Sequence, residues 1–133
     1  MKEFEKNNEK SQFEHLQEMA AVGEIQSSKA GHFYIEIFSR EYKTEIPHAT
    51  LLAPQRNGKQ SLVKIEIPNQ QPNLNDEPNF FWIREDFTIS NSLKKEIQNW
   101  FVEKDKRGLT GWEKASMYWE DQSKSVSWGQ LQK

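Results

Sequence analysis

The order of hydrophobic and polar residues along the chain shows a period of two in its middle part. Hydrophobic residues alternate with their neighbours at Phe33, Ile35 and Ile37, and a similar alternation runs through residues 62–67. Alternation of this kind, rich in aromatic and β-branched residues, is typical of strands with one buried face. The pattern therefore predicts antiparallel strands within residues 33–67.

The connections between these strands are also visible in the sequence. Asn57-Gly58 is the strongest turn signal in the chain, because both residue types tolerate the positive φ angles of a tight hairpin turn. Pro47 lies near the start of the second predicted strand, where a missing backbone N–H is tolerated. The apolar run at residues 80–84 is either a fourth strand or a buried linker. We therefore expect a sheet of three to four strands.

Helical spacing precedes the strands. Phe13, Leu16 and Ala20 are separated by three and four residues, and they follow a capping box that begins at Ser11. This spacing predicts a short helix over 11–22. The first ten residues contain almost nothing to bury, so we expect residues 1–10 to form a flexible lead.

Helical spacing also fills the C-terminal third. An apolar stripe through Leu93, Ile97 and Phe101 predicts a helix over 90–107. A second capping box, Thr110-Gly111-Trp112-Glu113, predicts another helix over 110–122. Because so little sequence separates the two helices, we expect them to pack as a helical hairpin against the sheet. Residues 123–133 are predicted to be a loose tail.

These elements predict one α+β domain over residues 11–122. A small antiparallel sheet packs against a C-terminal helical hairpin, with an extra helix at the N-terminal end. The length of 133 residues suits a single domain. The hydrophobic content of 35% is low, but 8 Phe, 5 Trp and 3 Tyr can each bury a large area. We expect a small, aromatic-rich core under a very polar surface.

Charge and composition exclude several classes of function. The chain has 18 basic and 20 acidic residues, a net charge of −2 and no cysteine, so disulfides, thiolate catalysis and sulfur-based zinc sites are excluded. No apolar run reaches the ~20 residues of a membrane span, and the charged first residues are unlike a signal peptide. We therefore expect a cytoplasmic protein without a membrane partner. Nucleic-acid binding through the basic residues of Lys94–Arg107 is a weaker alternative, because acidic residues are interleaved with them.

The segment 68–79 has three prolines, four asparagines and a single large apolar residue. A polar connection of this length is often a functional or mobile loop, although a plain surface excursion is the simpler interpretation. Its candidate binding residues are Asn73, Asn75 and Asp76.

Candidate catalytic residues are few. His48, on the second predicted strand, could act as a base with Glu36, Glu45 or Glu66 as its partner. The simpler interpretation is a structural or interface histidine, with Glu36 and Glu66 on the solvent-exposed side of the sheet. His32 is expected to be solvated. The sequence has no phosphate-binding glycine loop, nucleophile elbow or HExxH motif, and it predicts no metal site and no cofactor.

The aromatic residues of the C-terminal third fall into two groups. Trp100, Trp112 and Trp119 follow helical spacing and are expected to belong to the core. Tyr118 and Trp128 lie off that stripe. They are candidate contact residues, because tyrosine and tryptophan are enriched at the centres of protein interfaces.

The stretch from Phe33 to Leu52, with Ile46-Pro47-His48 inside it, resembles a small bacterial domain family of unknown function that carries a Pro-His-x-His strand motif. The resemblance covers about residues 33–122. It implies an α+β layout and a gene neighbourhood similar to that of toxin–antitoxin modules. Thr50 stands where the second histidine of the motif would fall, so any metal or proton role of that histidine pair would be impaired here.

These observations predict a non-enzymatic protein-interaction domain, such as an antidote, inhibitor or adaptor, in the cytoplasm of a prokaryote or phage-infected cell. We expect another protein as partner, contacted through the first helix, the 68–79 loop and the tail around Trp128. The alternative is a small hydrolase or nuclease-like toxin that uses His48 with a nearby carboxylate.

Overall fold

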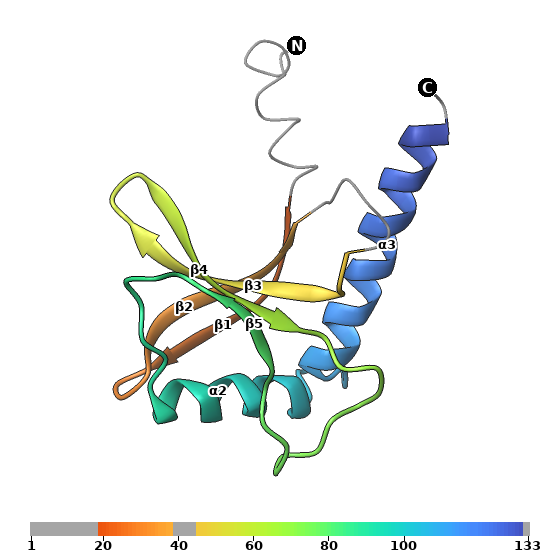
Figure 1. Ribbon diagram of the computed structural model, residues 1–133. Helices are drawn as coiled ribbons and strands as arrows, with labels where there is room; N and C mark the ends of the chain where they lie inside the picture. Colours follow the sequence, from red (N-terminus) through yellow and green to blue (C-terminus); the bar gives the residue numbers. More distant parts are fainter. Residues whose placement is uncertain (1–18, 39–44, 132–133) are drawn as a thin grey trace.

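The fold is built on a five-stranded antiparallel sheet in which every strand pairs with its neighbour in sequence (Figure 1). A computed structural model describes residues 19–38 and 45–131, and the side chains of residues 21–38 and 45–121. The strands run in the order β1-β2-β3-β4-β5. They are β1 (Met19–Ser27), β2 (Gly31–Phe38), β3 (His48–Gln55), β4 (Gly58–Glu66) and β5 (Phe80–Ile83).

The strand β1 corrects the expectation of a helix over 11–22. Residues 19–22 belong to β1 and pair with β2, while residues 11–18 lie outside the described residues. A register shift between Ala21 and Gly23 leaves Val22 and Ile25 as the buried residues of β1. The bulge thus spaces buried residues by three, which resembles the spacing of a helix. The sheet has five strands, more than the three to four expected.

The hairpin between β3 and β4 confirms the predicted turn, one residue earlier than expected. Gln55 pairs with Gly58, so Arg56 and Asn57 are the two turn residues. Gly58 opens β4 with a φ of +131°, a conformation that favours glycine.

One face of the sheet carries the core. Phe33, Ile35 and Ile37 of β2 are buried as predicted, together with the inward-facing residues of β3 and β4, Ala49, Leu51, Val63 and Ile65. Both helices cover this core (Figure 1). They contribute the buried residues Leu93, Ile97, Phe101, Ala115 and Trp119. The α+β class is therefore confirmed.

The first helix of the described residues, α2 (Asn91–Val102), begins at a hydroxyl cap. The Oγ of Ser90 accepts a hydrogen bond from Leu93 N at 3.1 Å. The helix ends at Val102, five residues before the predicted end at residue 107. A tight turn follows, in which the carboxylate of Asp105 accepts from the N–H groups of Arg107 and Leu109 at 2.8 and 3.0 Å.

The second helix, α3 (Gly111–Leu131), begins with the predicted capping box. Thr110 Oγ1 accepts from Glu113 N at 3.0 Å, and Glu113 Oε1 accepts from Thr110 N at 2.8 Å. The helix continues to Leu131, so the expectation of a loose tail over 123–133 is wrong for residues 123–131; residues 132 and 133 lie outside the described residues. Figure 1 shows α3 rising steeply from the end of α2, so the two helices form a corner and not the helical hairpin that was expected.

The indole of Trp100 fills this corner. A Cβ atom placed on Gly23 of β1 would lie 2.2 Å from Trp100 Nε1, and one placed on Gly111 of α3 would lie 2.6 Å from Trp100 Cδ2. Gly23 directly follows the segment predicted to be a helix, and in the structure its missing side chain leaves space for the Trp100 ring. Two glycines make room for one ring at the place where sheet and helices meet.

Candidate binding surfaces

The last strand of the sheet, β5, presents consecutive large apolar side chains to solvent. Phe81, Trp82 and Ile83 are 41%, 39% and 43% exposed. A register shift between Lys64 and Ile65 of β4 leaves Phe81 as an extra residue opposite no partner. A bulge of this kind changes the direction in which the side chains of the strand point. The run at residues 80–84 is thus a fifth strand with an exposed apolar surface, and the alternative of a buried linker is wrong.

The free edge of β5 also directs main-chain groups outward. Within the described part of the chain, β5 is the end of the sheet. Arg84 N donates to Leu62 O at 2.8 Å, and Ile83 lies opposite Val63. These two facts place Ile83 in a non-hydrogen-bonded pair of the ladder, in which the N–H and C=O of a residue point away from the partner strand. The backbone of Ile83 is therefore oriented to bind a further strand.

His48 lies at the start of β3 among aromatic rings. Its ring centroid is 5.2 Å from that of Phe81 and 5.1 Å from that of Trp119. Its Nδ1 is 2.7 Å from the carbonyl oxygen of Ile46. Because a carbonyl oxygen only accepts, Nδ1 is the protonated nitrogen in this contact. These contacts describe a histidine packed at an aromatic cluster.

Two of the three carboxylates expected beside His48 form contacts with other residues. Glu66 is the cross-strand neighbour of His48, but its Oε1 accepts from Asn79 Nδ2 at 2.5 Å. Glu36 pairs with Thr50 in the adjacent row of the sheet and is bound to Lys59. Glu36 and Glu66 are therefore not brought together. Glu45, the third candidate partner, lies just before β3 and is half-buried.

Glu36 corrects the expectation of a solvent-exposed glutamate. Its side chain is 0% exposed, and its Oε2 accepts from Lys59 Nζ at 2.5 Å. The Lys59 ammonium also lies 4.5 Å from the ring centroid of Tyr34. Within the described residues, the buried Oε1 of Glu36 has no hydrogen-bond partner. The ion pair between Glu36 and Lys59 thus connects β2 to the start of β4.

His32 is less solvated than expected. Its Nε2 lies 2.7 Å from Glu24 Oε2, and its ring centroid is 4.9 Å from that of Tyr34. Glu24 and His32 are both partly exposed, so this cross-strand pair is a surface contact.

The loop 68–79 is held to the body of the protein by polar contacts. Buried Gln98 of α2 donates from Nε2 to Asn73 O at 2.8 Å. Buried Thr110 donates from Oγ1 to Gln71 Oε1 at 2.8 Å. Trp112 Nε1 donates to Pro68 O at 2.8 Å. The first half of the loop is therefore anchored to α2 and to the start of α3.

The two ends of the loop are also joined. Glu66 N donates to Asn79 O at 2.8 Å, beside the side-chain contact between the same two residues. The loop therefore closes on itself, as a compact surface loop does.

The predicted binding residues of the loop lie beside two open hollows. Asp76 lines both hollows, Asn75 lines the one against α2, and Asn73 lines the one inside the loop. Asn73 and Asp76 also stabilise the loop, because Asp76 Oδ2 accepts from Asn73 N at 2.9 Å. Tyr118 is 36% exposed on α3, away from both hollows. Trp128 belongs to α3 by its backbone, and its side chain lies outside the described residues.

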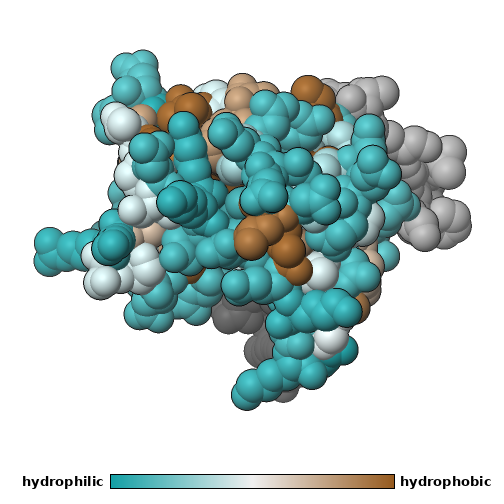
Figure 2. Space-filling model, turned by 90° about the horizontal axis from the view of Figure 1, so that it is seen from below, coloured by the Kyte–Doolittle hydropathy of each residue, from teal (hydrophilic) through white to brown (hydrophobic). Residues whose placement is uncertain are grey.

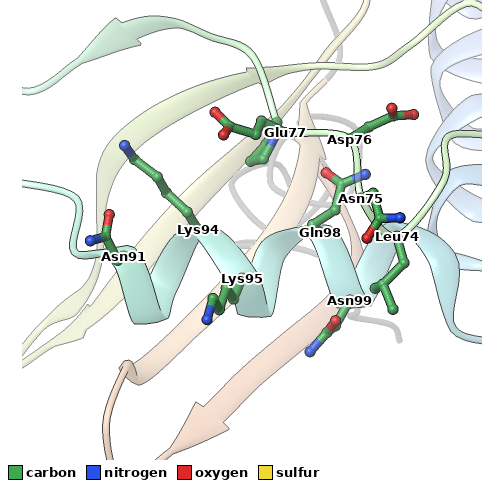
Figure 3. Close-up of a pocket in the computed structure, with 10 residues that line it drawn as sticks. Leu74, Asn75, Asp76, Glu77, Asn91, Lys94, Lys95, Gln98 and Asn99 are labelled. Carbon is green, nitrogen blue, oxygen red and sulfur yellow. The ribbon is translucent and has the colours of Figure 1, made fainter.

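The hollow against α2 has a volume of about 520 Å³ (Figure 3). Figure 3 shows Lys94 on the same side of α2 as Glu77, and Lys95 on the opposite side. The hollow inside the loop has a volume of about 560 Å³. Seen from below, the molecule is largely hydrophilic, with apolar residues in a few separate places (Figure 2).

The comparisons with known proteins do not assign the chain to a family. No protein-family model, no curated protein and no solved structure matches the chain. The resemblance to the Pro-His-x-His family therefore stays a prediction. Neither helix, over the residues that the structure describes, combines the length and the apolar character needed to cross a bilayer.

Proposed function

We propose that this protein is a non-enzymatic interaction domain that binds an extended segment of another protein along the edge of β5. The observation that carries the proposal is the exposure of Phe81, Trp82 and Ile83 on a strand whose outer main-chain groups point away from the sheet. Strand addition at an open edge combines main-chain hydrogen bonds with pockets for apolar side chains. A role as antidote, inhibitor or adaptor in a prokaryotic cytoplasm accords with this mode of binding.

The size of the patch favours a peptide segment over a second folded copy. Stable protein interfaces bury roughly 1,600 Å² in total. Three half-exposed side chains on a strand of four residues offer much less. An added strand gains affinity from backbone pairing, which a small patch can support. His48 packs against Phe81 and so supports the surface from behind.

The test is site-specific photo-crosslinking in cells. A benzoylphenylalanine in place of Phe81 is expected to give a discrete adduct with another protein. The control places the same group at Met117, which is 53% exposed on α3. Equal adducts at both positions would show non-specific contact and contradict the proposal.

Edge substitutions make the test specific for strand addition. Ile83→Pro removes an N–H that points away from β4, so the existing ladder keeps its bonds while the free edge loses a donor. The adduct is expected to disappear in Ile83→Pro and to persist in Ile83→Ala. An adduct that survives Ile83→Pro, or one with twice the mass of the chain, would refute strand addition by a different protein.

A further inference from the structure

One row of cross-strand neighbours runs across the whole sheet and ends at β5. From β1 to β5 its members are Ala21, Glu36, Thr50, Lys64 and Trp82. The row lies on the face opposite to the helices, because the residues next to it along the strands, such as Ile35, Leu51 and Val63, belong to the core. A strand added to the edge of β5 contributes a sixth residue to this row, beside Trp82.

The backbone of β5 determines which residue of an added strand lies in this row. The N–H and C=O of Ile83 point away from β4, so one residue of the added strand pairs directly with Ile83. The side chain of that residue lies on the same face as Ile83, the face of the core. The residues before and after it point to the other face. One of these two residues lies beside Trp82, whichever direction the added strand runs.

The row carries a positive charge at the β5 edge. The ammonium of Lys64 lies 5.8 Å from the ring centroid of Trp82, and the Trp82 ring attracts it there. Among the residues that the structure describes, Lys64 forms no ion pair. The other charged residue of the row, Glu36, lies two strands away and is bound to Lys59. The charge of Lys64 is therefore directed toward the edge.

The carboxylates that flank the edge in sequence do not neutralise this charge. Glu66 Oε1 accepts from Asn79 Nδ2, and Asp86 Oδ1 accepts from Arg84 Nε at 3.0 Å. An added strand can supply the missing carboxylate. Neighbouring strands are about 4.8 Å apart, so Lys64 and the added residue, with β5 between them, are about 10 Å apart. The long side chains of lysine and glutamate can together span this distance across the ring, whereas aspartate is one methylene shorter.

We infer that the edge of β5 selects an extended segment in which apolar and acidic residues alternate, with a glutamate in the row of Lys64 and Trp82. An apolar side chain lies next to Ile83 on the face of the core, and the glutamate binds the Lys64 ammonium across the Trp82 ring. The inference rests on the proposed strand addition and adds the chemistry of the partner. Because opposite charges attract and like charges repel, acidic segments are preferred over basic ones.

The test is an NMR titration of the full chain with three peptides that differ at two positions. The acidic peptide is acetyl-Thr-Val-Glu-Val-Glu-Val-Thr-amide, and the other two carry glutamine or lysine in place of both glutamates. The two glutamates ensure that one lies beside Trp82 in either strand direction. Saturable shifts are expected at the backbone amides of residues 81–84. The acidic peptide should bind about 2- to 5-fold more tightly than the glutamine peptide, as expected for an exposed ion pair, and the lysine peptide should bind most weakly.

Matched variants connect the preference to Lys64. Lys64→Met removes the charge but keeps a long side chain beside Trp82, so it should abolish the preference for glutamate over glutamine and leave the affinity of the glutamine peptide unchanged. Lys29→Met makes the same change in the turn between β1 and β2, at the opposite edge of the sheet, and should retain the preference.

The outcomes separate this inference from the proposed strand addition. Equal affinities of the three peptides, or a preference that survives Lys64→Met, would overturn the inference while the shifts at β5 still support strand addition. If none of the peptides gives saturable shifts at residues 81–84, strand addition itself is contradicted and the inference is lost with it.

Discussion

Lys59→Met tests the burial of Glu36 directly. In the native protein the Glu36 carboxylate is fully buried and is neutralised by Lys59, while its second oxygen is unbonded within the described residues. Methionine keeps most of the length and volume of the lysine chain but removes the charge. The variant therefore leaves a negative charge inside the protein without a counterion.

The magnitude follows from the exposure of the two partners. Breaking a fully buried ion pair by removing one partner costs about 3–5 kcal/mol. The Lys59 side chain is 33% exposed, so water reaches one end of the pair and the expected loss is about 2–3 kcal/mol. With an m value of roughly 1–3 kcal/mol/M for urea, the unfolding midpoint should fall by about 0.7–3 M.

The assay is urea unfolding followed by circular dichroism at neutral pH, with two controls. Lys29→Met removes an exposed lysine in the β1–β2 turn and should change the free energy of unfolding by less than about 0.5 kcal/mol. The double variant Glu36→Gln/Lys59→Met should recover much of the loss, because a neutral amide needs no counterion. The reasoning is refuted if Lys59→Met unfolds at the same urea concentration as Lys29→Met.

Three further substitutions test local features. The pKa of Asp105 is lowered, chiefly by the hydrogen bond from the N–H of Leu109. The carboxylate therefore stabilises the fold above its unfolded pKa of about 3.9, and this contribution is lost as the pH falls through the folded pKa. Asp105→Asn should show a smaller drop in urea midpoint between pH 7 and pH 3 than the wild type. Gly111→Ala places a methyl group 2.1 Å from Trp100 O and should destabilise by about 1–3 kcal/mol or more, measured as a fall in Tm, and an unchanged Tm would contradict the packing. Ser90→Ala removes the cap of α2 and should cost about 1 kcal/mol in the same assay, with Ser90→Asn retaining most of the stability.

The elements with local signals were predictable from the sequence. The alternation at Phe33, Ile35 and Ile37, and the capping box at Thr110, are patterns within a few residues, and the structure has both. β1 gave no such signal, because a bulge spaces its buried residues Val22 and Ile25 by three. In that segment, pairing with β2 overrides the local preference.

The errors at candidate sites come from contacts between distant parts of the chain. Glu36 has the position of an exposed strand residue, and its ion-pair partner Lys59 lies 23 residues later in the sequence. The contacts that anchor the 68–79 loop are made by Gln98 and Thr110, which lie 25 and 39 residues after their partners Asn73 and Gln71, so the composition of the loop could not predict them.

The exposed apolar side chains of β5 have a recognisable pattern in the sequence. Four large apolar residues in succession, Phe80 to Ile83, show no alternation. In a strand with only one face packed against helices, successive side chains point to opposite sides, so part of such a run must meet solvent or a partner. The sequence therefore predicts an exposed apolar surface at this strand, but it does not predict which of the four residues are exposed.

The position of Trp100 between Gly23 and Gly111 has a consequence for how the protein unfolds. The indole is in contact with the first strand, its own helix and the start of the last helix at once, so none of the three can separate without moving it. Sheet and helices should thus melt in one concerted transition. Trp100 is partly buried and is one of five tryptophans, so the total tryptophan emission should shift to longer wavelength together with the loss of ellipticity.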